Sequence, residues 1–407
     1  GSGAHPLISP MHILFVSHSL PPAGRPLSNI GGMQRVASKL HDELAAHDEV
    51  ELSAALMRSS WRWIHARTPF FLARAGWKIR QTVKQHDVDV VLFSSMVTAA
   101  LAVPLRPLFD RHGVTAAAIV HGLDVTTPFP PYQWFVPKVF DALDAVLPVS
   151  QATGGACQER GLPADKMHVV PNGIDLDRLP PLADRTTMRR ELTRALSRDA
   201  HPLPDDALLL CSVGRQVERK GFAWFVEHVM PHLPDSIHYW MAGDGPRAET
   251  IQAAIDRHEL GHRVRRLGQV TEQNLIRLYR GADLFVMPNI PVEGDMEGFG
   301  IVMLEAGRSG CPVIASRLEG IRDVIQEGVN GHLVPPQQPP AFVDAILRYV
   351  GASAQLEAAS ARAAQHVTDT YGWPSVANQY VQTLTRVAVP PSVEPPLRAP
   401  AAAMAAD

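Results

Sequence analysis

Two glutamates eight positions apart, Glu297 and Glu305, are the most informative feature of the chain. They belong to the segment EGFGIVMLEAG, which follows the apolar run ADLFVMP. Gly298 and Gly300 leave the first N–H groups of the predicted helix uncovered, and these groups together with the helix dipole favour an anion. A carboxylate within an apolar helix needs a hydrogen-bond donor, which a ribose or sugar hydroxyl would supply. The pattern therefore predicts a nucleotide-sugar site.

A second motif, GRQVERKGF, directly follows the predicted strand ALLLCSV. It places Arg215 and Lys220 in one loop, and Gly214 and Gly221 permit unusual backbone angles there. Arginine binds a diphosphate bidentately and lysine binds it as a point charge, so the loop is suited to a pyrophosphate leaving group. The alternative is a solvated basic loop.

The first half of the chain carries a glycine pair, Gly31 and Gly32, in the segment NIGGMQRV after the first predicted strand. Glycines before a helix let the backbone approach a phosphate or a sugar, although an ordinary glycine turn is the alternative. The segment is not GxGxxG, which argues against a nicotinamide dinucleotide, and the chain has no GxxxxGK[ST] motif of an NTPase.

A histidine ends another predicted strand in the first half. His121 follows TAAAIV, at the edge where ligands of parallel sheets bind. Asp124 would orient a ligand hydroxyl or start the next turn. A structural role is the alternative for both residues.

No metal or cofactor is expected. The 18 histidines show no HExxH motif. Asp-x-Asp patterns occur at 87–89 and 175–177, but strand entry and helix capping explain them. Arg215 and Lys220 would neutralise a diphosphate in place of a metal ion.

The segment 58–84 is basic and aromatic. It contains seven arginines and lysines, no acidic residue and five large aromatic residues. This composition suits peripheral contact with an anionic membrane surface or an anionic acceptor. In the alternative, the aromatic side chains face the domain core and the charges face water.

Short apolar runs alternate with helical patterns along the whole chain, which predicts parallel sheets covered by helices on both faces. The expected fold class is α/β, with two Rossmann-like domains that face a cleft. We expect an N-terminal Rossmann-like domain at 11–185, a C-terminal Rossmann-like domain at 186–372 that carries the two motifs suited to a nucleotide sugar, a helix at 373–388 that crosses back, and a disordered tail at 389–407. The predicted strands are 12–18, 50–56, 89–95, 115–122, 145–150, 168–173, 207–214, 237–243, 263–270, 283–288, 312–316 and 332–336.

Composition limits the class of protein further. The net charge of −3 gives no reason to expect nucleic acid as a partner. The three scattered cysteines suit buried, reduced thiols in the cytoplasm. The first ten residues lack the pattern of a signal peptide, and the longest uncharged run is shorter than the ~20 residues of a membrane span. We therefore expect a cytoplasmic protein, with 58–84 as its candidate contact with the inner face of the membrane.

These motifs together resemble a known family. EGFGIVMLEAGRSGCPVIAS is similar to the E-x7-E signature of the GT-B glycosyltransferases of family 4, which are retaining enzymes that use nucleotide sugars. GRQVERKGF matches the phosphate loop of that family, and VVPNGID, MAGDGP, LGQV and ADLFVMP follow the family's order. The resemblance covers about residues 11–388. The loop NIPVEGDM before Glu297 is longer than usual, which leaves open whether Glu293 or Asp295 also contacts the sugar.

The resemblance implies a role for each motif residue. Glu305 would hold the ribose hydroxyls, the loop from Arg266 to Val270 would read the base through its backbone, and His121 would bind a sugar hydroxyl. The implied catalytic residues are Glu297, His121, Arg215 and Lys220. The implied donor-binding residues are Gly31, Gly32, Gly214, Arg215, Lys220, Val270, Glu297, Gly298, Phe299, Gly300, Ile301, Val302 and Glu305.

The implied reaction moves a hexose-type sugar from a UDP- or GDP-linked donor to an unidentified acceptor, with retention of configuration. The acceptor would be a glycan, a lipid-linked glycan or a small molecule in polysaccharide or glycoconjugate synthesis. An epimerase or a phosphorylase on the same fold is the alternative enzyme, and a non-catalytic nucleotide-sugar binder is the alternative outside catalysis.

Overall fold

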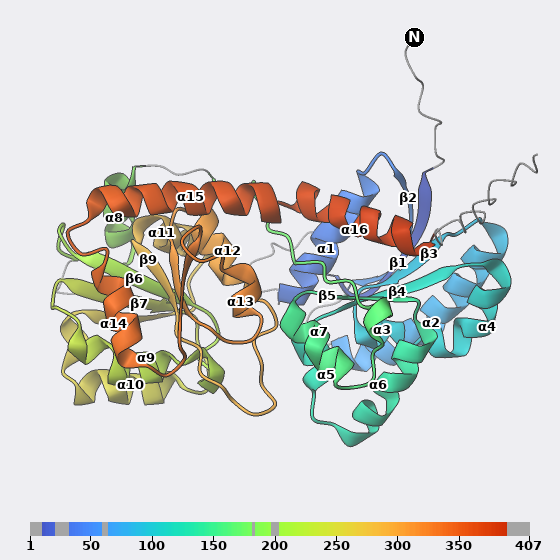
Figure 1. Ribbon diagram of the computed structural model, residues 1–407, viewed down its shortest axis with the longest axis horizontal. Helices are drawn as coiled ribbons and strands as arrows, with labels where there is room; N and C mark the ends of the chain where they lie inside the picture. Colours follow the sequence, from blue (N-terminus) through green and yellow to red (C-terminus); the bar gives the residue numbers. More distant parts are fainter. Residues whose placement is uncertain (1–9, 21–31, 59–63, 181–183, 197–202, 389–407) are drawn as a thin grey trace, which may run out of the picture.

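The chain forms two α/β domains placed side by side (Figure 1). The structure is a computed structural model, and it describes residues 10–20, 32–58, 64–180, 184–196 and 203–388. The glycine at position 31 and the tail at 389–407 lie outside the described residues. None of the helices in the described ranges is both long enough and apolar enough to cross a membrane.

The first domain contains a five-stranded parallel sheet in the order β2-β1-β3-β4-β5. Alternate residues of its strands point to opposite faces, as a pleated strand requires. Ile13 and Phe15 join the core beneath α1 and α16, whereas Leu14 and Val16 join the core beneath α2 and α4. The strands are β1 (Met11–Leu20), β2 (Val50–Arg58), β3 (Val90–Phe93), β4 (Thr115–Val120) and β5 (Ala145–Pro148). The helices are α1 (Gly32–Ala45), α2 (Ile64–Gln85), α3 (Met96–Ala99), α4 (Ala102–His112), α5 (Gly122–Thr126), α6 (Pro130–Ala142) and α7 (Gln151–Gln158).

The second domain contains a six-stranded parallel sheet in the order β11-β10-β9-β6-β7-β8. Its central strands are buried on both faces and are almost wholly apolar, as expected of a parallel sheet covered by helices. The strands are β6 (Leu208–Val213), β7 (Ile237–Ala242), β8 (Val264–Gly268), β9 (Leu284–Met287), β10 (Val313–Ser316) and β11 (Gly331–Val334). The helices are α8 (Arg185–Leu196), α9 (Phe222–His228), α10 (Ala248–Arg257), α11 (Glu272–Gly281), α12 (Ile301–Arg308), α13 (Ile321–Val324), α14 (Pro339–Leu347) and α15 (Ser353–Tyr371). The last helix, α16 (Trp373–Ala388), follows α15 but packs on the first domain.

The predicted fold class is confirmed, but one predicted strand is wrong. Residues 168–173 form no strand, although the N–H groups of His168 and Val170 donate to Val146 and Pro148 of β5 at 2.9 and 3.1 Å. Pro171 follows and has no N–H group to continue such a ladder. The chain therefore runs beside the edge of the sheet briefly and then leaves toward the second domain.

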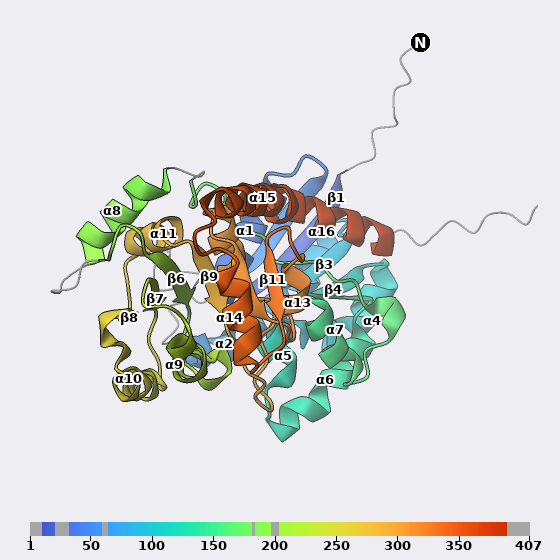
Figure 2. The ribbon, with the colours of Figure 1, turned by 60° about the vertical axis from the view of Figure 1, so that its left-hand side comes forward.

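Two stretches of chain connect the domains, and they are hydrogen-bonded to each other. The N–H of Ile174 donates to the carbonyl of Tyr371 at 2.8 Å, and the N–H of Trp373 donates to the carbonyl of Ile174 at 3.3 Å. Helix α15 packs against α12 of the second domain, and α16 packs against α1 of the first. Figures 1 and 2 both show these two helices along one side of the molecule. The last helix thus ties the first domain to the second.

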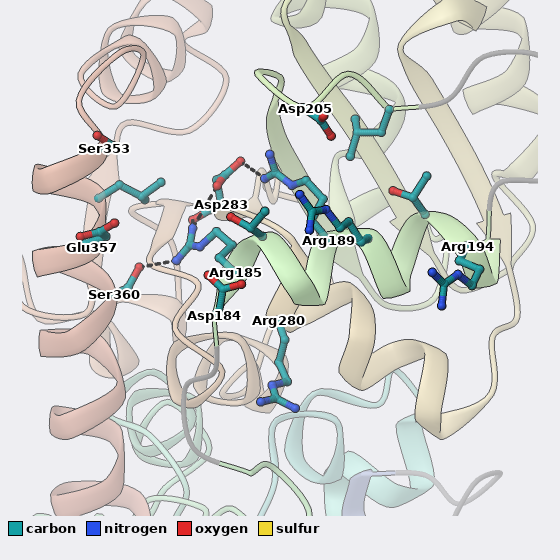
Figure 3. Close-up of a pocket in the computed structure, with 15 residues that line it drawn as sticks. Asp184, Arg185, Arg189, Arg194, Asp205, Arg280, Asp283, Ser353, Glu357 and Ser360 are labelled. Carbon is teal, nitrogen blue, oxygen red and sulfur yellow. Dashed lines mark hydrogen bonds and ion pairs between the residues drawn. The ribbon is translucent and has the colours of Figure 1, made fainter.

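A buried carboxylate fixes α8 to the second sheet. Asp283 precedes β9, pairs with Arg185 at 3.0 Å and with Arg189, and accepts the N–H of Leu209 at 2.7 Å. Arg185 also donates to Ser360 of α15 at 2.6 Å. Figure 3 shows these groups converging at one side of a cavity of about 820 Å³. Asp283 thus joins α8 to β6, and Arg185 extends this link to α15.

We expect Asp283→Asn to lower the free energy of unfolding by about 3 kcal/mol, because it leaves two partly buried guanidinium groups without their counter-charge. Urea denaturation monitored by circular dichroism measures this change. Asp205→Asn is the matched control, since Asp205 lines the same cavity but is exposed. An equal effect of both substitutions would contradict the role given to Asp283.

Candidate active site

The carboxyl ends of the two sheets face each other, and the backbones of the two domains touch there. Gly122 follows β4 and Gly298 follows the long loop after β9. A Cβ atom built on Gly122 would lie 3.0 Å from the Cα of Gly298, so neither position has room for a side chain. This contact brings the segment after His121 against the segment after Glu297. The predicted motifs of the two domains therefore meet at one place.

The basic loop after β6 is shaped by the second domain. Gly214 ends the strand, and Lys220 lies in a short 3-10 turn, Glu218–Lys220. The ammonium of Lys220 lies 3.7 Å from the position of a Cβ atom on Gly214, so the side chain folds back over the strand end. Gly221 has a φ of 65°, and a Cβ atom there would lie 1.9 Å from the carbonyl oxygen of Pro288. A glycine is thus required where this loop crosses the end of β9.

Glu297 is buried within a cluster of positive charge. Its Oε2 accepts from Lys220 Nζ at 2.6 Å and from the guanidinium of Arg219, and Asn289 Nδ2 lies 3.3 Å away. Burial by itself would raise the pKa of Glu297, but the charges and hydrogen bonds of Lys220 and Arg219 outweigh burial and hold the pKa at about 2. Glu297 is therefore ionised at every physiological pH.

The low pKa of Glu297 predicts a loss of stability in acid. The carboxyl has a pKa of 4.5 when unfolded and about 2 when folded, so the unfolded chain binds more protons between these values. This contribution to the free energy of unfolding is present above about pH 4.5, and about 3 kcal/mol of it is lost as the pH falls toward 2. Urea unfolding at stepped pH measures the slope, which we expect to be shallower in Glu297→Gln. Equal slopes for the two proteins would contradict the pairing.

His121 lies buried at the domain interface, as the residue before α5. Burial lowers its pKa, although the nearby Asp124 acts in the opposite direction. The imidazole is therefore neutral near pH 7 and can exchange hydrogen bonds with a hydroxyl. Asp124 accepts the N–H of His121 at 3.3 Å and that of Met96 at 3.5 Å, so its role here is to cap the short helices beside the histidine.

Glu305 is the centre of a second cluster, which spans both domains. Tyr279 donates to its Oε2 at 2.9 Å, and Arg178 binds its Oε1. Arg35 of α1 lies 3.9 Å from the same oxygen and 3.5 Å from Glu272, which Arg178 also binds. Two glutamates of the second domain are thus joined to a cation of the first domain and to a cation of the connecting segment.

A cavity of about 270 Å³ lies between the domains at this cluster. It is near the lower limit for a small-molecule pocket. Helix α1 forms one side and α12 forms the opposite side. It is lined by Arg35, Val36, Lys39, Gly173, Ile174, Asp175, Arg178, Val213, Leu275, Ile301, Val302, Glu305 and Trp373.

The structure brings most of the expected site residues to this interface. Ile301, Val302 and Glu305 line the cavity, whereas Glu297 and Lys220 do not line it and form an ion pair between the loops after β9 and β6. The side chain of Phe299 is anchored in the core against Tyr371, with ring centroids 6.2 Å apart. Its backbone therefore follows a fixed path into α12.

Other expected site residues do not line the cavity. Arg215 follows the strand end but its side chain is exposed. Gly32 begins α1, the helix that lines the cavity, and Gly300 has a φ of 82° at the start of α12. Val270 lies half-buried after β8 and does not line the cavity.

Sequence reasoning missed the cations that hold the two glutamates. Arg219 stands beside Lys220 in the motif, but nothing local indicates that it turns back to Glu297 and to Asp295, 2.9 Å away. Arg178 lies in the connecting segment, far from Glu305 in sequence. Asp295 is held by Arg219, and Glu293 of the same loop is exposed.

Two family models match the chain. Residues 30–178 match the model described as Glycosyltransferase Family 4, and residues 207–351 match Glycosyl transferases group 1. A D-inositol 3-phosphate glycosyltransferase of Xylanimonas cellulosilytica is 34% identical over 53% of this chain, and the match spans 50% of that relative. A GDP-mannose-dependent alpha-(1-6)-phosphatidylinositol monomannoside mannosyltransferase of Mycolicibacterium smegmatis is 27% identical over 89% of this chain and 95% of its own length.

Solved structures agree on the fold. HepE of Anabaena in complex with UDP superposes with a TM-score of 0.68 at 17% identity, over 92% of this chain and 100% of that one. Sucrose-phosphate synthase of Thermosynechococcus elongatus gives a TM-score of 0.70 at 21% identity, over 93% and 99%. The chain belongs to the family 4 type of GT-B glycosyltransferases, enzymes that act on nucleotide sugars. These matches do not favour an epimerase or a phosphorylase.

Proposed function

We propose that the protein transfers a hexose-type sugar from a UDP- or GDP-linked donor, with retention of configuration, to an acceptor in glycoconjugate or polysaccharide synthesis. The observation that carries the proposal is the meeting of the Glu297 cluster, the Glu305 cavity and His121 at one domain interface. Each of these features suits a different part of a nucleotide sugar.

The nucleoside would occupy the cavity between α1 and α12. Glu305 would bind the ribose hydroxyls, which requires Arg178 or Tyr279 to give up a hydrogen bond to it. A ligand that replaces internal partners without leaving them unsatisfied loses little free energy in the exchange. The N–H groups at the start of α12, at Ile301 and Val302, would receive the phosphates together with the helix dipole.

The diphosphate would be neutralised by Arg215 and Lys220 without a metal ion. The side chain of Arg215 is exposed in this loop, whereas that of Lys220 is buried and paired with Glu297. Since Glu297 lies against Lys220, an arriving phosphate would share that lysine with the carboxylate. The stabilisation of the departing diphosphate would then come from fixed cations and N–H groups, which need no reorganisation during the reaction.

Transfer would take place on the face of the sugar from which the diphosphate departs. A phosphate oxygen would accept the proton of the acceptor hydroxyl as the bond to the anomeric carbon breaks. Glu297 is ionised and held by two cations, so its task would be to position the sugar and the lysine. Neutral His121 would hydrogen-bond a sugar hydroxyl from the first domain, and positioning of this kind supplies much of the rate enhancement.

The comparisons support two choices of donor. One relative is named as GDP-mannose-dependent, and one solved neighbour is described in complex with UDP and glucose. Thermal unfolding with UDP, GDP and ADP at equal concentration separates these choices, since the nucleotide that binds most tightly raises the melting temperature most.

We expect Arg215→Ala to lower the turnover of donor roughly 10²-fold, because a cation that faces the departing diphosphate is lost. Release of nucleoside diphosphate in a coupled assay measures this change. Arg194→Ala removes an exposed arginine of α8 that does not line the cavity between the domains, and it serves as the control. Turnover of Arg215→Ala equal to that of the control would reject the assigned role.

The stereochemical part of the proposal has its own measurement. Proton NMR of the product formed from an α-linked donor should show an α-linked sugar, with unchanged rate in the presence of EDTA. A β-linked product would reject retention, and loss of activity in EDTA that is restored by added magnesium would reject catalysis without a metal.

A further inference from the structure

The backbone of Glu297 is held by a turn between β10 and α13. The carboxylate of Glu319 accepts the N–H of Glu297, and the N–H of Gly320 donates to the carbonyl of Glu297 at 3.1 Å. A Cβ atom on Gly320 would lie 2.2 Å from the carbonyl oxygen of Gly298, so the turn lies directly against the chain there. Two consecutive residues of another loop thus bind both backbone polar groups of Glu297.

The backbone conformation of Glu319 indicates that its side chain is needed. Its φ is 46°, in the left-handed region, which costs free energy for any residue that carries a Cβ atom. Within the described ranges, Glu259 and Gln337 also have a positive φ, but their side chains are exposed, whereas Glu319 is half-buried. A glycine would adopt this turn without strain but could not accept the N–H of Glu297. Strain of this kind persists where surrounding contacts offset it, and it is frequent at functional sites.

The same segment of chain contacts the first domain four residues later. Asp323 of α13 accepts the N–H of Gln151 at 2.6 Å and that of Ala152 at 3.4 Å. These N–H groups begin α7, and a carboxylate is favourable there because they have no partner within the helix. Figures 1 and 2 both show α13 beside α7 at the boundary between the domains. A carboxylate of the second domain thus caps a helix of the first.

The backbone of Asp323 is also tied to the connection between the domains. The hydroxyl of Tyr371 donates to the carbonyl of Asp323 at 3.3 Å. The carbonyl of Tyr371 accepts the N–H of Ile174 at the point where the two connecting stretches meet. The segment Glu319–Asp323 therefore binds Glu297 at one end, and at its other end it binds both the first domain and the connection to it.

We propose that Glu319 and Asp323 act together as positioning residues, so that the contact between the domains sets the position of Glu297. Asp323 docks the segment on α7, and Glu319 fixes the N–H of Glu297 relative to that segment. Separation of the domains removes the N–H groups of α7 from Asp323 and leaves the turn at Glu319 less firmly held. The action of Glu297 on a donor sugar rests on the proposed function, whereas its link to the domain contact does not.

Hydrogen–deuterium exchange of the full chain, read out by mass spectrometry of its peptides, tests the link without any assay of activity. Asp323→Ala should accelerate exchange in the peptide that contains Glu297 roughly fivefold, which corresponds to the loss of one helix cap of typical strength. The matched control is Asp184→Ala, which removes a carboxylate that accepts the N–H of Thr187 at 2.8 Å within the second domain. Unchanged exchange at Glu297 in Asp323→Ala, or an equal acceleration in the control, would overturn the proposal.

Turnover of the donor tests the role of Glu319. Glu319→Gly should lower kcat roughly 10-fold with an unchanged KM for the donor, because a displaced positioning group slows the reaction without removing a binding contact. Glu319→Gln keeps an oxygen that can accept the N–H of Glu297, so it should retain the wild-type kcat. The control is Glu259→Gly, the same substitution at a positive φ but on an exposed side chain. A kcat of Glu319→Gly equal to that of the control, or an equal loss in Glu319→Gln, would reject this role.

The variant that combines Glu319→Gly with Asp323→Ala tests whether the two residues act together. Residues of one unit have non-additive effects, so the combined loss of kcat should be close to the larger of the two single losses. A combined loss equal to the product of the single losses would contradict the coupling. A wild-type chain with neither turnover nor a nucleotide-induced rise in melting temperature would reject the proposed function, and the exchange experiment would still decide whether the domain contact sets the position of Glu297.

Discussion

The second domain depends on a carboxylate held between two cations where its loops meet. Glu297 comes from the loop after β9, whereas Lys220 and Arg219 come from the loop after β6. Burying any one of these charged groups alone would cost free energy, and this cost is offset only when all three groups are brought together. The three groups therefore fix the start of α12 relative to the basic loop, which is where the proposed function places the phosphates.

A second buried carboxylate, that of Glu305, also needs partners, and it lies at the domain interface. Glu305 is satisfied by Tyr279 and Arg178, and Arg35 extends the cluster to the first domain. These bonds offset the cost of burying the carboxylate, because an unsatisfied buried charge is expensive. Under the proposed function, ribose hydroxyls would replace some of these internal partners, so binding would be an exchange of hydrogen bonds at the domain interface.

Most of the fold could be predicted because its strands are central, parallel and apolar on both faces. Runs such as DLFVMP and ALLLCSVG carry that signal within a few residues. The strand at 168–173 was wrongly predicted because an apolar run shows that a segment is buried but not whether a neighbouring strand pairs with it. Helix α2 shows the same limit, since only its packing separated the buried Phe71 from the exposed Phe70 beside it.

The sequence by itself determined which residue types stand at the strand ends and the starts of helices, and therefore which charged groups the domain interface contains. Those features are local, so the spacing of glycines, cations and carboxylates along the sequence is enough to predict them. Only the tertiary structure decided which cation holds which carboxylate. Arg219 and Arg178 reach their partners across 78 and 127 positions of sequence, and such distances are closed by the packing of whole sheets and not by any pattern along the chain.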